Sequence, residues 1–133
     1  SEDALARQLT ELTYHGVFSA ETELSGIVAY QRQDYERERH RGRLMQVYVK
    51  PALRGTGAAL AMIEATVAEA ENEVVQLHLM VGTQNEPAIR LYKKAGFEIY
   101  GTDRRALLVN GRYIDEHMMV RFLDKAPGKS EHE

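Results

Sequence analysis

One stretch, residues 44–71, constrains the fold of this chain more than any other. It runs from a strand-like segment, LMQVYV at 44–49, through KPAL into RGTGAA at 54–59, and then into a long helical segment. Glycines let a backbone approach a ligand closely, and the unpaired N–H groups that open a helix point toward negative charge. Because Arg54 adds a cation at the same place, the stretch predicts a strand, an anion-binding turn and a helix.

Two common phosphate-binding loops fit this turn poorly. A Walker loop requires Lys and then Ser or Thr after its second glycine, but two alanines follow Gly57, which excludes it. A dinucleotide fingerprint needs a third glycine where Leu60 stands and an acidic residue near the end of the next strand, where residues 77–81 have none. The dinucleotide interpretation is therefore weak.

A second motif follows one strand later, at residues 85–97, NEPAIRLYKKAGF. Together the two motifs resemble the GNAT superfamily of acetyl-CoA-dependent N-acetyltransferases. In that family the pyrophosphate turn is Arg or Gln, two residues, Gly, one residue, then Gly or Ala, and a segment with Asn, Ala, Leu-Tyr and Gly-Phe lies downstream. Both motifs occur here in the family's order, and the resemblance covers residues 25–122.

The resemblance implies an α/β (α+β) fold. The central sheet would be mixed and mostly antiparallel, flanked by helices, with a splayed pair of parallel strands that holds the pantetheine arm of the cofactor. The family's domain begins with a strand and a helix that we expect to be missing here. Their loss would expose sheet edge and apolar surface, which predicts a homodimer or larger assembly.

The composition of the chain argues against several other classes of protein. With 133 residues, 44% hydrophobic and 28% charged, the chain suits one soluble domain, assigned to 1–123 with a polar tail at 124–133. No apolar run is long enough to cross a bilayer and the start lacks a signal-peptide pattern, so no membrane partner and a cytoplasmic location are expected. A net charge of −3 argues against nonspecific nucleic-acid binding. The lack of cysteine excludes disulfides, thiolate metal sites and a cysteinyl acyl intermediate.

Hydrophobic periodicity and turn signals predict the elements. The N-terminal part should contain a helix at 1–14 ended by His15-Gly16, then a hairpin of strands at 17–20 and 23–33. The mixed-charge segment 35–43 is interpreted as a solvated hairpin loop rather than a basic patch for RNA or phosphate. Later elements should be a helix at 58–70, strands at 74–81 and 97–100, and a hairpin of 106–109 and 112–123 around Asn110-Gly111.

The resemblance also implies the chemistry: direct attack of a primary amine, on a small molecule or a protein, on the thioester of acetyl-CoA. An alkyl ammonium must first lose a proton, at a cost of roughly 4–5 kcal/mol at neutral pH. By family analogy Tyr92 is the general acid that protonates the leaving thiolate, and strand N–H groups around Val47 and Val49 hold the oxyanion. The cofactor-binding residues implied are Val47, Val49, Arg54, Gly55, Thr56, Gly57, Ala58, Ala59, Asn85, Ala88 and Tyr92.

The general base is left open. The family often places a glutamate on the strand before the turn, but residues 44–49 have none. His78 and Glu116 are the candidates, with His117 beside Glu116 and a water chain as alternatives. No metal is expected, because Asp115, Glu116 and His117 are adjacent on a strand and alternate between its faces. The alternatives are a non-catalytic CoA-binding or regulatory module that uses the same turn, and a nucleotide-binding regulatory domain.

Overall fold

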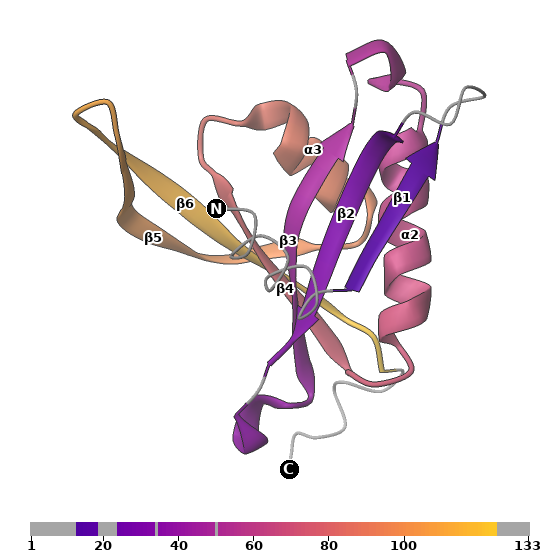
Figure 1. The fold of residues 1–133 in the computed structure, drawn as a ribbon. Helices are drawn as coiled ribbons and strands as arrows, with labels where there is room; N and C mark the ends of the chain where they lie inside the picture. Colours follow the sequence, from indigo (N-terminus) through magenta and orange to yellow (C-terminus); the bar gives the residue numbers. More distant parts are fainter. Residues whose placement is uncertain (1–12, 19–23, 34, 50, 125–133) are drawn as a thin grey trace, which may run out of the picture.

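The computed structural model describes residues 13–18, 24–33, 35–49 and 51–124, which form one six-stranded sheet with two α-helices (Figure 1). The elements in chain order are β1 (Thr13–Phe18), β2 (Leu24–Arg32), β3 (Arg41–Val49), α2 (Ala58–Ala70), β4 (Gln76–Gly82), α3 (Glu86–Lys94), β5 (Glu98–Val109) and β6 (Arg112–Phe122). Their order across the sheet is β1-β2-β3-β4-β6-β5. All neighbours are antiparallel except β3 and β4. The predicted fold class is confirmed.

The N-terminal hairpin was predicted correctly in kind but not in its bounds. Residues 1–12 of the expected helix lie outside the described residues, and Thr13 and Tyr14 belong to β1. His15 and Gly16, expected to end the helix, pair with Val28 and Ile27 of β2. From the local sequence, Gly16 suggested the end of a helix. Because it pairs with β2 and lies inside a strand, the predicted helix end was wrong.

The parallel strands β3 and β4 are paired over only three residue pairs, Arg41 with Gln76, Gly42 with Leu77, and Arg43 with His78. Beyond them β3 carries a bulge, because Tyr30 pairs with Leu44 while Ala29 pairs with Gln46. A bulge bends its strand and increases its twist. The strands diverge from this point toward their carboxyl ends (Figure 1), which confirms the expected splay.

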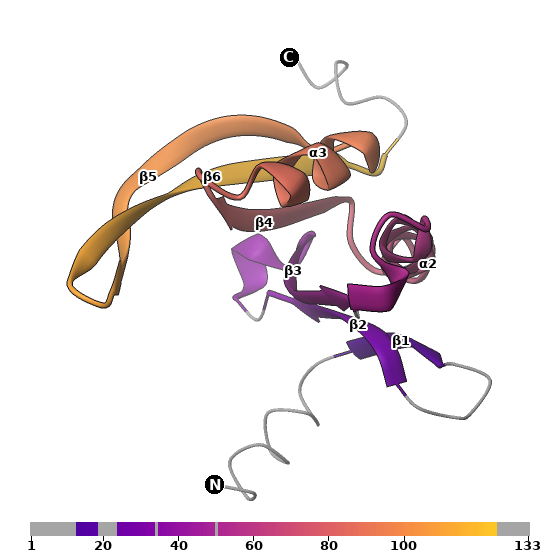
Figure 2. The same cartoon turned by 90° about the horizontal axis from the view of Figure 1, so that it is seen from above.

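One hydrophobic core lies between the sheet and the helices. It joins Ile63 and Val67 of α2 to Leu77 and Leu79 of β4 and to Phe97 after α3. Arg121 of β6 reaches both helices: its guanidinium donates to the carbonyl of Ala95 at 2.7 Å and pairs with Glu64 of α2 at 3.3 Å. Both helices therefore cover the same face of the sheet (Figure 2). We call the opposite side, which carries Gln76, His78 and Met80 of β4, the open face.

The described helices begin and end close to where the sequence places them. The observed α2 has the predicted bounds, and Asn85 caps the start of α3. Gly96, at φ +92°, ends α3 in the left-handed conformation that the sequence predicts. No helix among the described residues is long and apolar enough to span a bilayer.

The C-terminal hairpin is longer than predicted. Strand β5 runs without a break through residues 101–105, where no strand was expected. Arg105 lies there at φ +56°, and its backbone N–H donates to the Asp115 carboxylate at 2.8 Å. This irregularity hides the strand pattern in the sequence. The turn itself is confirmed, because Asn110 and Gly111 both have positive φ, as a tight hairpin requires.

The charged segment is shorter than predicted, because β3 begins at Arg41 rather than Leu44. Residues 35–40 form the expected exposed connection and include a short 3-10 helix, Glu36–Glu38. The remaining residues, 41–43, are the ones that pair with β4.

Candidate active site

The predicted anion-binding turn lies between a 3-10 helix, Pro51–Leu53, and the start of α2, and its residues 54–57 are exposed. Gly55 and Gly57 have φ of +82° and +91°, and a Cβ at either would meet no atom of the described chain within 4 Å. The Thr56 hydroxyl accepts from the backbone N–H of Ala58 at 3.3 Å. The N–H groups of residues 59 and 60, in the first turn of α2, have no helical carbonyl four residues back. The turn thus has the open backbone and exposed donors that an anion requires.

Val47 and Val49 lie on the side of β3 where the sheet opens. Their backbones pair with Val28 and Gly26 of β2. Toward β4, none of residues 44–49 has a ladder partner, and residues 79–82 of β4 have none toward β3. The two edges form a wedge whose closed end is the Arg43–His78 pair and whose wide end faces the turn. Free strand edges can hydrogen-bond an extended ligand, as in strand addition.

Two predicted residues lie on α3. The Asn85 side chain accepts from the backbone N–H of Ala88 at 3.3 Å, so its role as a helix cap is established, and its contact with the pantetheine arm stays a prediction. Tyr92 packs against the core and meets Phe97 edge to face, with ring centroids 6.3 Å apart. Burial raises the pKa of the Tyr92 phenol above its ordinary value of 10.0. The hydroxyl is therefore protonated at neutral pH, as a proton donor must be.

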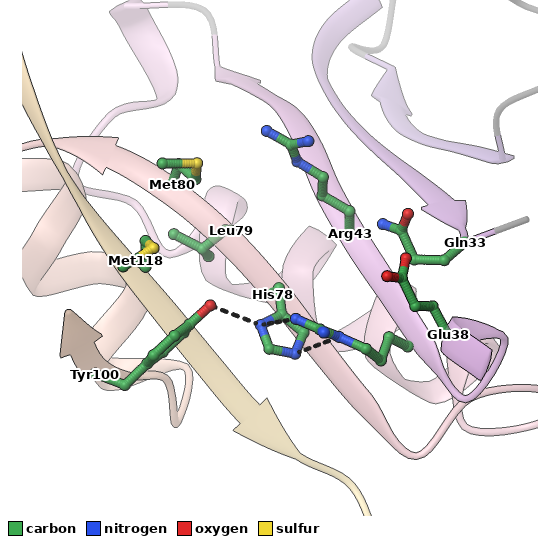
Figure 3. A pocket seen from close by; sticks show the side chains of 9 residues that line it. Gln33, Glu38, Arg43, His78, Leu79, Met80, Tyr100 and Met118 are labelled. Carbon is green, nitrogen blue, oxygen red and sulfur yellow. Dashed lines mark hydrogen bonds between the residues drawn. The ribbon is translucent and has the colours of Figure 1, made fainter. Parts of the chain in front are cut away.

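A pocket of about 270 Å³ lies on the open face next to the closed end of the wedge. Its lining comes from the β2–β3 connection and from four strands: Gln33, Glu38, Arg41, Arg43, His78, Leu79, Met80, Tyr100 and Met118. Figure 3 shows Tyr100 pointing at His78, with Arg43 on one side of the space and Met80 and Met118 on the other.

His78 is held by polar neighbours on three sides. Its Nε2 lies 2.7 Å from Gln76 Oε1 and its Nδ1 lies 3.3 Å from the Tyr100 hydroxyl. In the tautomer with hydrogen on Nε2, the ring donates to Gln76 and accepts from Tyr100. Arg41 Nε lies 3.2 Å from Nε2 and can donate to it only in the other tautomer, while the Arg41 terminal nitrogen lies 3.3 Å from Nδ1 and can donate to it in this one. Burial, followed by the charges of Arg41 and His40, lowers the pKa of His78 to about 4, so the imidazole is neutral but weakly basic at pH 7.

The structure does not bring the two candidate bases together. Glu116 pairs with Gly82, which places its side chain on the open face at the wide end of the wedge. His78 is four residues earlier on β4, so the two are separated by roughly 13 Å along the strand. They are alternatives and cannot form one acid–base pair.

Sequence reasoning missed most of this pocket. Arg41 and Arg43 were assigned to a solvated loop, yet they alternate on β3 and both line the pocket. The signal was available, since two arginines two residues apart before a hydrophobic strand can share one of its faces. Tyr100 and Met118 become neighbours of His78 only through strand pairing, which the sequence does not display. Within the described ranges, no group of three or more His, Cys, Asp or Glu is placed to hold a metal ion.

Comparison with known proteins assigns the family. Residues 2–97, more than half of the chain, match the Acetyltransferase (GNAT) family, and the chain belongs to it. L-amino acid N-acetyltransferase AaaT of Escherichia coli K12 is 39% identical over 70 residues, 51% of this chain and 43% of that protein. Spermidine N(1)-acetyltransferase of the same strain is 30% identical over 85 residues, 62% and 46% of the two chains. The chain thus spans about half the length of these curated relatives.

The solved structures agree with the fold. The crystal structure of an acetyltransferase of the GNAT family from Streptococcus pneumoniae superimposes with a TM-score of 0.78 at 27% identity. The match covers 91% of this chain and 74% of that one.

Proposed function

We propose that the chain is an acetyl-CoA-dependent N-acetyltransferase that acts on a primary amine by direct attack. The observation that carries the proposal is that β3 and β4 lose their pairing beyond Arg43 and His78, on the part of β3 that leads into the glycine turn. Family membership gives this opening a ligand, because the relatives matched are acetyltransferases.

The residues present fit acetyl-CoA. The exposed donors and two positive-φ glycines of the turn suit a diphosphate, and the unpaired strand edges suit an amide-containing arm. The residues proposed to hold it are Val47, Val49, Arg54, Gly55, Thr56, Gly57, Ala58, Ala59, Asn85, Ala88 and Tyr92. When bound, acetyl-CoA would supply an activated acetyl group as a thioester.

The chain's own residues would orient the reactants and move protons. Backbone N–H groups at the free edge of β3 are proposed to stabilise the negative charge that develops during acyl transfer. Tyr92 keeps its proton at neutral pH and is proposed as the proton donor to the leaving sulfur. His78 is a weak base in the free protein, and Glu116 lies at the other end of the wedge. Deprotonation of the amine through ordered water is therefore as well supported as either side chain.

Binding and turnover together test the proposal. Calorimetry should detect acetyl-CoA binding, and release of free thiol should depend on an added amine. Binding without thiol release for any amine in a broad panel would favour the non-catalytic module. If neither CoA nor acetyl-CoA binds, the proposed function is wrong.

Assembly and location are also proposed. Four apolar residues near the tip of the β5–β6 hairpin are 43–64% exposed: Leu107, Leu108, Val109 and Tyr113. The hairpin projects from the sheet (Figure 1), and we infer that a second copy of the chain covers it in a homodimer. A cysteine-free chain gains nothing from an oxidising compartment, and we propose a cytoplasmic enzyme.

A further inference from the structure

We propose that the open-face pocket binds an acceptor that carries a carboxylate beside its amine, that is, a small amino acid or a close analogue. Arg43 and Arg41 would bind the carboxylate. This inference deepens the proposed function and rests on it, since it names the class of amine.

The charges of the pocket point to an anionic group. Two guanidiniums, Arg41 and Arg43, and one carboxylate, Glu38, are among the lining residues, and His78 is neutral at pH 7. Among the residues the structure describes, neither guanidinium has a carboxylate within ion-pair distance. Arg41 lies instead against a neutral imidazole. A guanidinium matches a carboxylate with two parallel hydrogen bonds, so this lining is suited to one.

The position of the pocket points to the acceptor. A ligand anchored at the turn and extended along the wedge has its far end toward the Arg43–His78 pair, where the strands meet. The pocket opens on the sheet face beside that same pair. A carboxylate held by Arg43 would therefore place a neighbouring amine close to the reactive end of the wedge.

The size and the remaining walls limit the acceptor further. A volume of about 270 Å³ lies just below the usual range of pockets for drug-sized ligands and suits a molecule as small as an amino acid. Met80 and Met118 provide flexible apolar surface for a side chain. A polyamine would have to place its cations beside two arginines, so the pocket disfavours that class.

Matched acceptors test the inference. Methionine, methioninamide and 3-(methylthio)propylamine share a side chain and an amine but differ in the carboxylate. We expect kcat/KM for methionine to exceed that of the other two by at least tenfold. Arg43→Gln should remove most of this preference, whereas Arg37→Gln, an exposed arginine in the same connection outside the pocket, should keep it. Equal use of the three amines by the wild type would overturn the inference and leave the proposed function standing.

Binding of product-like probes tests the pocket even if none of these amines is acetylated. N-acetylmethionine should bind at least tenfold tighter than its amide to the wild type, and Arg43→Gln should abolish the difference while acetyl-CoA binding persists.

The His78 ring gives a direct signature, because a carboxylate beside Arg41 offsets the positive charges of Arg41 and His40. Glu38, Arg43, Gln76 and Tyr100 also surround the ring and are the same in both complexes. The pKa of His78 measured by NMR should therefore rise when the acid binds and stay constant when the amide binds. Equal affinity for acid and amide, or no change in this titration, would refute carboxylate binding. Failure of acetyl-CoA itself to bind would instead refute the proposed function.

Discussion

Gly57 combines two demands at one residue. Its φ of +91° strains any residue with a Cβ, and the space beside it is open in the protein. Gly111 in the hairpin turn has the same properties, with φ of +77°, far from the turn in sequence. Comparing the same substitution at Gly57 and at Gly111 therefore distinguishes the cost of backbone strain from a loss of ligand binding.

We expect Gly57→Ala and Gly111→Ala to destabilise the protein by similar amounts, about 1–2 kcal/mol each in urea unfolding. Only Gly57→Ala should weaken CoA binding, by at least tenfold in calorimetry, because its methyl group would occupy the anion's space. Equal CoA affinity in the two variants would place the diphosphate elsewhere.

Substitution of Tyr92 tests whether the protein catalyses acetyl transfer or only binds acetyl-CoA. Tyr92→Phe keeps the ring that packs against Phe97 and removes only the hydroxyl. We expect kcat to fall by roughly 10²–10⁴ while acetyl-CoA affinity stays within a small factor, since the lost interaction belongs to the transition state. The loss should be largest at low pH, where a departing thiolate most needs a proton. Unchanged turnover, with thermal stability measured alongside, would make Tyr92 a packing residue only.

His78 predicts a pH dependence of stability. Its folded pKa of about 4 lies below the ordinary value of 6.5, so the unfolded chain binds the proton first as pH falls. The neutral ring makes its full contribution to the free energy of unfolding above pH 6.5, and this contribution is lost progressively as the pH falls toward 4. Urea unfolding between pH 7 and 4.5 should show a shallower decline for His78→Gln than for the wild type. Parallel declines, or an NMR midpoint near 6.5, would contradict this assignment.

Among the elements, the short β3–β4 pairing is the most sensitive. Gly42 lies in its centre, and a Cβ there would come within 2.6 Å of Tyr30 Cε1 and 3.0 Å of Leu77 Cδ2, both in fully buried side chains. We expect Gly42→Ala to destabilise the fold by about 1–3 kcal/mol through overpacking. Gly82→Ala on β4 is the control, because its Cβ would meet only Ile114 at an ordinary 3.7 Å. Similar urea midpoints for the two variants would refute the overpacking argument.

Some of these elements could be predicted from the sequence, and others could not. α2, the cap at Asn85, Gly96 and the Asn110-Gly111 turn follow from local rules that need no tertiary contact. The start of β1, the middle of β5 and the bulge in β3 depend on pairing between strands. The site divides in the same way: its glycine turn is visible as a motif, while the Arg41, His78 and Tyr100 cluster is assembled from three strands.

At the scale of the whole molecule, the exposed hairpin tip predicts self-association. Light scattering at tens of micromolar should give the mass of a dimer for the wild type. Leu108, 64% exposed near the tip, should be essential, so Leu108→Arg should yield a monomer. Tyr35→Ser, which changes an even more exposed side chain (76%) outside the hairpin, should leave the dimer intact. A monomeric wild type at this concentration would exclude the proposed interface.

The sheet can also be viewed as two plates, one of β1, β2 and β3 and the other of β4, β6 and β5, each continuous in sequence. The strand ladder between them has three residue pairs, while α2 and the shared hydrophobic core span both plates. We expect a change at the bulge or at Gly42 to tilt one plate against the other, because Gly42 lies between Tyr30 of one plate and Leu77 of the other. The angle between the plates sets the width of the wedge, so we expect mutations beside this seam to change the size of the ligand that fits between β3 and β4.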